Sequence, residues 1–364
     1  MRDIRFLVRP RGLGRAAERS GVPLFLVALV LLFIFDPTTS ENFRSAGNLE
    51  NIFANQSVTG LIALASVIPM VAGYIDLSVA GIAGLANVVA AAIIGTYHQS
   101  VLVGLVAGVA IAALVGAING VLIAMLRLNP FICTLGVYIF IGGILELYTK
   151  GQTISNGLPV SMSGWDSAKW LGVAQPFWLL LVVAVVAWYV LTQTPFGRKL
   201  AAIGSNEPAA RLAGFRVDRA VFVTFLLSGL LGGVAGDLLT AQTLGADATT
   251  GASYLFPALA AVFLGQTAIR PGQFNVWGTI FGVFLVAVAV DGFTLLGAQA
   301  WVDQVFNGGA LVVSVAFSTL MARARDRRAR TEAMRAMQDA GSPAQHHDTQ
   351  VPDVSHADAP TADV

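Results

Sequence analysis

A small set of polar and aromatic side chains lies inside or beside otherwise apolar stretches of this sequence. A carboxylate or amide in hydrocarbon is costly, so it usually faces a bundle interior or water, where it can hydrogen-bond a solute or bind an ion. Aromatic rings nearby can cover the apolar face of such a solute. The residues that could form a solute pathway in this way are Asp76, Asn119, Asp237, Gln242, Phe256, Asp291 and Phe293.

Each of these residues also has a structural alternative. A polar side chain between helices can simply hold the bundle together, through a hydrogen bond worth about 0.6–2 kcal/mol. The two phenylalanines can face lipid or pack. Asp76 follows Pro69 and Gly73, which weaken a helix, so it can cap the helix that begins after it. These alternatives stay open at the level of sequence.

Residues for other kinds of chemistry are scarce. Cys133 is the only cysteine and His98 is the only histidine outside the last 20 residues, so we expect no catalytic constellation and no metal site. The phosphate-binding pattern Gly-x-x-x-x-Gly-Lys-Ser/Thr does not occur, so we expect no ATPase site and no cofactor in this chain. Nothing in the sequence points to nucleic acid.

The composition places the chain in a lipid bilayer. Of its 364 residues, 55% are hydrophobic and only 12% are charged, and a soluble fold could not bury so much apolar surface. A helix of roughly 20 residues crosses the hydrocarbon. We therefore predict an all-α polytopic membrane protein with about ten transmembrane helices, over residues 22–35, 52–73, 77–97, 101–126, 131–148, 176–191, 220–241, 254–269, 274–296 and 302–321.

Basic residues set the expected orientation. Arginines cluster before residue 22 and after residue 321, and five Lys or Arg lie between residues 198 and 219. Ten crossings put all three clusters on the cytoplasmic side, as the positive-inside tendency requires. The expected organisation is a basic cytoplasmic segment at 1–21, a permease domain at 22–321 with a cytoplasmic loop at 193–219, and a basic, then disordered tail at 322–364.

The loop at 193–219 predicts a short helix on the cytoplasmic surface. Ser205 or Asn206 can cap it, Glu207 favours its first turn, Pro208 is tolerated there, and Gly214 can end it. Two turns are too short to be stable alone in water, so this helix needs a partner surface. An ordinary surface loop is the structural alternative.

The same loop resembles that of the ribose-type ABC permeases, the membrane subunits of bacterial sugar importers. The similarity extends to residues 71–86, 130–136 and 258–279, and covers roughly residues 50–320 in order. Departures include Tyr74 and Gln266, where the family usually has glycine, and they weigh against ribose itself as the solute. The matching loop residues are Thr194, Phe196, Gly197, Arg198, Ala202, Ile203, Gly204, Asn206, Glu207, Ala209, Ala210, Arg211 and Gly214.

The resemblance implies a function and a set of partners. The chain would be the inner-membrane permease subunit of an ABC importer for a monosaccharide or similar small polar solute. A separate cytoplasmic ATPase would bind ATP and Mg²⁺, an extracytoplasmic binding protein would deliver the solute, and a second copy or a related permease would complete the pore. Coupling to the ATPase would involve Arg198, Asn206, Glu207, Ala210, Arg211 and Gly214. An ion-gradient-driven secondary transporter is the alternative, with intramembrane carboxylates as ion sites.

Overall fold

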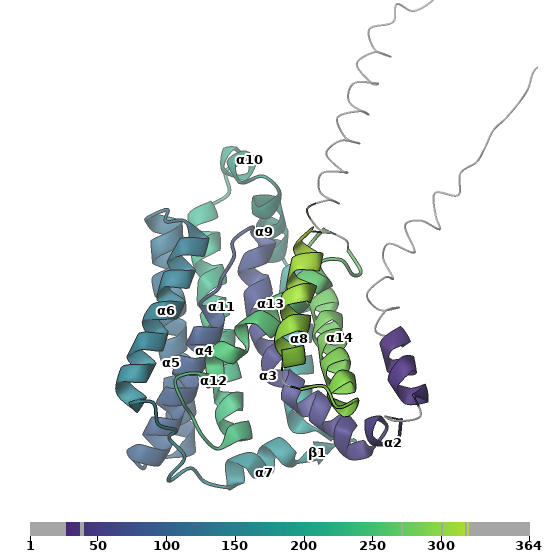
Figure 1. Cartoon of the computed structure of the whole chain (residues 1–364). Helices are drawn as coiled ribbons and strands as arrows, with labels where there is room; N and C mark the ends of the chain where they lie inside the picture. Colours follow the sequence, from purple (N-terminus) through teal and green to yellow (C-terminus); the bar gives the residue numbers. More distant parts are fainter. Residues whose placement is uncertain (1–26, 37–39, 271, 300, 317–318, 320–364) are drawn as a thin grey trace, which may run out of the picture. The chain divides into compact units, whose positions relative to one another are not determined.

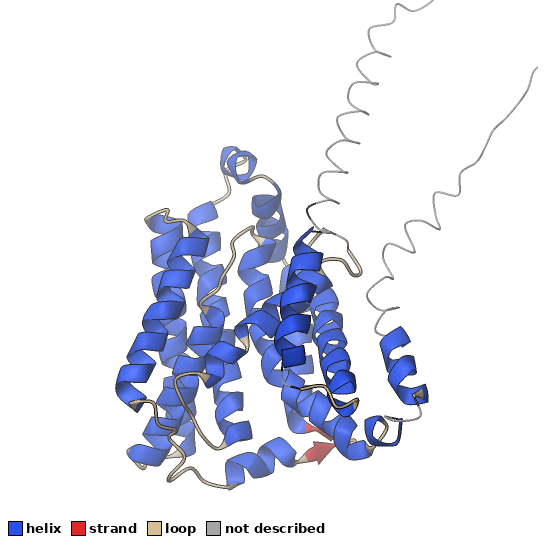
Figure 2. Cartoon of the chain, in the orientation of Figure 1, coloured by secondary structure: helices blue, strands red, loops and turns tan. Residues whose placement is uncertain are grey.

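The computed structural model describes residues 27–36, 40–270, 272–299, 301–316 and 319. All of them belong to the first of two compact units, which ends at Thr319. The predicted basic segment at 1–21 and the predicted tail at 322–364 lie outside the described residues. Within the described part the chain is almost entirely helical, and its one hairpin pairs β1 (Lys169–Trp170) with β2 (Val173–Ala174) (Figure 2).

The apolar stretches predicted from the sequence form the main helices. Besides helices at residues 27–35 and 301–316, the elements are α2 (Ser40–Phe43), α3 (Ala46–Val71), α4 (Val79–Ala91), α5 (Val101–Gly120), α6 (Pro130–Thr149), α7 (Ser161–Ser167), α8 (Gln175–Gln193), α9 (Pro195–Ser205), α10 (Glu207–Leu212), α11 (Val217–Thr243), α12 (Thr250–Ser253), α13 (Leu255–Gly265) and α14 (Val276–Leu295). Short π-helical turns extend α4 over Ala92–Thr96 and α5 over Val121–Met125.

Seven of the described helices are long and apolar enough to cross a membrane. They are α3, α4 and α5 (the last two with their π turns), α6, α8, α11 and α14, and they confirm seven of the predicted segments. The segment predicted at 254–269 instead forms the shorter pair α12–α13, broken at Tyr254. The segments predicted at 22–35 and 302–321 are described only in part. The count of ten crossings and the cytoplasmic side of both termini remain predictions.

The core lies where α3, α4 and α11 pack together. Most of α3 and α4 is buried, and the largest core cluster joins residues of α3, α4, α8, α11, α13 and α14. The helices can approach each other closely because small residues lie between them. For example, Gly116 of α5 contacts Gly229 of α11. In contrast, α5, α6 and α8 expose many large apolar side chains, such as Leu102, Phe140 and Val186. In a membrane protein, exposed apolar surface of this kind can contact lipid or another membrane-embedded chain.

Two ends of the helical unit carry different elements. In Figure 1, α9 and α10 lie at one end, and α7 with the hairpin lies at the opposite end. The chain between α3 and α4 is not helical. Gly73 has φ +88°, and residues 74–77, called the extended segment below, lead from it toward α4. Non-helical backbone at this depth is tolerated because it is buried in protein.

Candidate functional site

The short helix predicted in the polar loop is present as α10. The Asn206 side chain caps it by accepting a hydrogen bond from the Ala209 backbone N–H at 3.0 Å. Pro208 occupies the first turn, and Ala210 is buried beneath the helix. The chain leaves α10 through Gly214, whose φ of +83° is a left-handed conformation that favours glycine. Leu212, in contrast, is 91% exposed, which leaves an apolar side chain available for a partner.

The charges of α10 are paired within the chain. Arg211 contacts Glu207 at 2.9 Å and Asp218, in the first turn of α11, at 2.6 Å. The other Glu207 oxygen accepts a hydrogen bond from the Tyr74 hydroxyl at 2.9 Å. Burial and the Glu207 carboxylate raise the pKa of Tyr74 above its ordinary value, so this hydroxyl keeps its proton and donates. Glu207 therefore connects α10 to the extended segment between α3 and α4.

A second helix of the loop, α9, was not predicted from the sequence. Thr194 caps it by accepting from the Gly197 N–H at 3.4 Å, and Leu200 and Ile203 are buried on its inner face. Arg198, predicted to take part in coupling, lies on this helix and donates to the Gln193 carbonyl oxygen at 3.2 Å. The signal for α9 was available in the Thr-Pro start and in the three-residue spacing of Gly197, Leu200 and Ile203.

The end of α9 packs directly on the end of α3. A Cβ atom added to Gly204 would overlap the carbonyl oxygen of Val71, and the backbone of Gly204 lies against Gly73. We expect Gly204→Ala to lower the free energy of unfolding by about 1–3 kcal/mol, because the backbone must shift to admit the methyl group. Thermal unfolding in detergent measures this effect. Gly136→Ala in α6, where an added Cβ contacts nothing, is the control, and equal stability of the two variants would contradict the prediction.

The turn at Gly214 gives a separate prediction for the outer end of α10. Proline requires φ near −65°, so Gly214→Pro cannot adopt the native turn, and it also removes the N–H that bonds to the Arg211 carbonyl oxygen. If α10 couples the chain to an ATPase, as the resemblance to ABC permeases implies, we expect insertion to be retained and ATP-driven uptake to fall about fivefold or more. Uptake into vesicles holding the assembled complex measures this. Gly214→Asn, which tolerates positive φ, should retain most of the uptake, and normal uptake by the proline variant would refute the prediction.

Asp76 lies fully buried at the centre of the protein, just before α4. One carboxylate oxygen accepts from the Ser78 N–H at 2.9 Å and from the Ser78 hydroxyl at 2.6 Å, and the other accepts from the Ser228 hydroxyl of α11 at 2.7 Å. Asn119 of α5 donates to the Ser78 hydroxyl at 2.7 Å. Thr134 of α6 accepts from the Leu77 N–H at 3.1 Å. This buried cluster joins the start of α4 to α5, α6 and α11. The hydrogen bonds of Asp76 therefore fit a structural role, in which it holds these helices together.

The other predicted pathway residues do not lie with Asp76 and Asn119. Gln242 donates to the Ala54 carbonyl oxygen of α3 at 2.9 Å. Asp291 accepts from the Asn48 side chain at 2.8 Å, and the Phe293 ring lies edge-on to Phe33 at 5.9 Å. These three contacts tie neighbouring helices together. The seven predicted residues are thus spread over several parts of the bundle.

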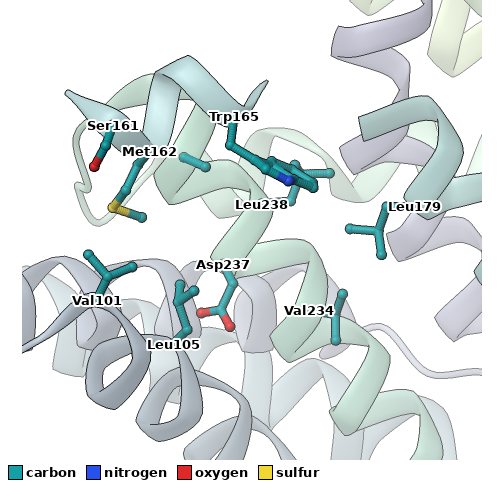
Figure 3. A pocket seen from close by; sticks show the side chains of 10 residues that line it. Val101, Leu105, Ser161, Met162, Trp165, Leu179, Val234, Asp237 and Leu238 are labelled. Atoms are coloured by element: carbon teal, nitrogen blue, oxygen red, sulfur yellow. The ribbon is translucent and has the colours of Figure 1, made fainter. Parts of the chain in front are cut away.

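Asp237 lines a cavity of about 450 Å³ among α5, α7, α8 and α11. Figure 3 shows its carboxylate beside Leu105, with Trp165 and Met162 of α7 above it. One Asp237 oxygen is buried and has no hydrogen-bond partner among the described residues. Most of the lining is apolar, which suits a hydrophobic group better than a sugar.

Phe256 lines a larger and more polar cavity of about 970 Å³. This cavity lies among α3, α12, α13, α14 and the helix at 301–316, and residues that the sequence did not single out supply its polar groups. Gln56 lies near the start of the segment predicted at 52–73, and Asp303 lies near the start of the segment predicted at 302–321. Polar residues at such positions are typical of the membrane interface, so no sequence signal separated these two from ordinary surface. The polar lining residues are Gln56, Thr59, Thr249, Ser253, Tyr254, Asp303, Gln304 and Asn307.

Comparison with known proteins gives the family. Residues 48–315 match a family model described as the permease component of branched-chain amino acid transport systems. The ribose import permease of Escherichia coli K12 is 33% identical over 293 residues, 80% of this chain and 91% of the relative. The ribose import permease of Bacillus subtilis 168 is 33% identical over 290 residues, 79% and 90%. The L-arabinose ABC transporter permease of Azospirillum brasilense is 30% identical over 308 residues, 84% and 89%.

These matches agree on architecture and class. The family description names amino acids whereas the curated relatives carry sugar names, but both describe the membrane permease component of an importer, which is not itself an enzyme. The matches span nearly the full length of the relatives, and the matched region contains all seven long apolar helices apart from the first residues of α3. This chain therefore belongs to the permease family of monosaccharide ABC importers, and it is a multi-pass protein of the bacterial inner membrane.

Proposed function

We propose that this chain forms the translocation pathway for a monosaccharide or a similarly small polar solute, and that ATP hydrolysis by a separate subunit drives it. The ATPase, which would bind ATP and Mg²⁺, docks on α9 and α10 at the cytoplasmic surface. An extracytoplasmic binding protein delivers the solute at the end that carries α7. A second copy of this chain, or a related permease, completes the assembly.

One observation carries the proposal. The exposed helix α10 is linked through Glu207 to Tyr74 in the extended segment, which also contains Asp76 two residues further on. Asp76 in turn binds Ser228 of α11, at the centre of the bundle. A movement of α10 is thereby passed to the packed core through hydrogen bonds and backbone, which supports rigid-body switching between two arrangements.

The relatives support the class of solute. Their names assign them ribose and L-arabinose, and a monosaccharide needs a path with several hydrogen-bonding groups and an aromatic or apolar surface. The departure at Tyr74 concerns the coupling segment, so it bears on how α10 is held and leaves the sugar open. We therefore propose a monosaccharide without choosing among pentoses and hexoses.

The experiment is reconstitution in lipid vesicles. The chain is co-purified with its ATPase and binding protein, and ATP hydrolysis and uptake are measured with ribose, arabinose and allose in turn. We expect one sugar to stimulate hydrolysis and to accumulate only when ATP is present. Vesicles holding only this chain serve as the control.

Secondary transport is the second candidate, and the unpartnered Asp237 oxygen favours it, because a buried carboxylate can bind a proton or cation. In that case the chain alone would accumulate solute when a proton or sodium gradient is imposed. Accumulation by the chain alone would replace the ATP-driven proposal, and its absence would remove the alternative.

A further inference from the structure

The cavity lined by Phe256, beside the helix at 301–316, has more polar lining residues than the cavity that holds Asp237 and than a third cavity beside α14. Polar side chains from α3, α12 and the helix at 301–316 converge on it, among them Thr59, Ser253 and Asn307. The cavity that holds Asp237 has two polar side chains amid apolar ones, and a third cavity, between α14 and the helix at 27–35, has only Arg44. Convergent polar groups in a cavity of this size are typical of a site for a small polar molecule.

Asn307 is the most telling of these groups. It is only 7% exposed, it lines the cavity, and its Oδ1 atom has no hydrogen-bond partner among the described residues. A buried acceptor without a partner loses its hydrogen bonds to water and gains none in the folded protein, which lowers stability. Such groups are few in native proteins. Because Asn307 also lines the cavity, a molecule bound there can supply the missing donor after a small rotation of the amide.

The same helix continues the pattern beyond the cavity. Ser314 is 2% exposed, and its hydroxyl also has no partner in the part of the chain that the structure describes. Residues 307 and 314 are seven apart, so they lie on one face of the helix, about 10 Å from each other along its axis. The helix at 301–316 therefore presents two buried and unpaired polar groups in a line along one face.

We propose that this cavity is a sugar-binding subsite of the pathway, in which Asn307 Oδ1 accepts a hydrogen bond from a hydroxyl group of the passing monosaccharide. The ring of Phe256, which is 58% exposed and lines the same cavity, covers the apolar face of the sugar. Ser314 is the next contact along the helix. This inference rests on the proposed function, because it names the residues that recognise the transported solute.

A hydrophobic occupant would not fit these observations. A lipid chain in the cavity would leave the Asn307 oxygen unpaired and would add the cost of desolvating Thr59 and Ser253. A monosaccharide offers several hydroxyl donors at once and needs no charge from the site. The partly buried Tyr254 and the exposed Asp303, which also line the cavity, give it further partners.

The test is Asn307→Leu in the full complex with ATPase and binding protein. Leucine has a similar volume but no acceptor, and removing an unpaired buried acceptor should leave folding unharmed. We expect an unchanged or higher melting temperature, and uptake of radiolabelled ribose, arabinose or allose reduced about 3–10-fold, the effect of one lost hydrogen bond. Asn307→Ser, which keeps an oxygen, should recover part of the uptake.

The controls separate the possible outcomes. Val312→Ala, on the exposed side of the same helix, should change neither stability nor uptake. A lower melting temperature for Asn307→Leu would mean that Asn307 holds the fold together and would overturn the inference, as would normal uptake. Absence of sugar uptake by the wild-type complex would instead overturn the proposed function, and the inference with it.

Discussion

Asp76→Ala is expected to lower the free energy of unfolding by about 3–5 kcal/mol, the largest stability effect of any single change considered for this protein. The substitution removes three hydrogen bonds to a fully buried carboxylate and leaves the Ser228 hydroxyl and the Ser78 backbone N–H without that acceptor. It also removes the group that anchors the start of α4. The melting temperature in detergent, followed by size-exclusion chromatography after heating, measures the loss.

Asp76→Asn is the matched control. Its remaining oxygen can still accept from Ser78, and the Ser228 hydroxyl can turn to accept from the new amide, so most of the cluster survives. We expect a loss of about 1 kcal/mol, the size of a typical hydrogen bond. If alanine were tolerated as well as asparagine, the cluster around Asp76 would not be the joint that holds α4, α5 and α11.

Glu207→Arg is expected to have the largest effect on transport. The new cation replaces the partner of Arg211 with a like charge and removes the acceptor for the Tyr74 hydroxyl. The Glu207 and Arg211 side chains are at the surface, so we expect the protein to insert and remain folded while ATP-driven uptake falls about 5–150-fold, the usual range of a coupling free energy. Parallel assays of ATP hydrolysis and uptake in vesicles give the ratio of solute moved to ATP hydrolysed.

Two further variants divide this effect into its parts. Glu207→Gln keeps an acceptor for Tyr74 but removes the charge, whereas Tyr74→Phe removes only the hydroxyl. If the link from α10 to the core matters most, Tyr74→Phe should lower the ratio more than Glu207→Gln does. Unchanged uptake in Glu207→Arg would count decisively against α10 as the coupling element.

Much of the fold could be predicted from hydropathy and capping residues. Long apolar runs located seven helices, because a helix that crosses lipid must be apolar over most of its length. The cap at Asn206 and the glycine at 214 located α10 to within a residue, because such termini need a side-chain acceptor and a left-handed residue. Helix α9 was missed, because its buried face is only three residues wide within a polar stretch.

The site was harder to predict, for a geometric reason. Sequence gives the depth of a residue along its helix but not the direction that it faces, since that depends on which helices become neighbours. Asp237 and Asp291 both lie within apolar helices, yet one lines an apolar cavity and the other binds Asn48. Asn307 escaped notice because only its burial and its unpaired oxygen distinguish it from an ordinary polar residue near a helix end.

The extended segment before α4 has a consequence for how the protein is made. Its backbone at Leu77 binds Thr134, 57 residues later, and Asp76 binds Ser228, 152 residues later. Ribosomes deliver the chain from its N-terminus, so these polar groups enter the membrane before their partners exist. The helices α3 and α4 therefore cannot complete their packing as an isolated helical hairpin. The buried centre of the permease forms only once α11 has been synthesised.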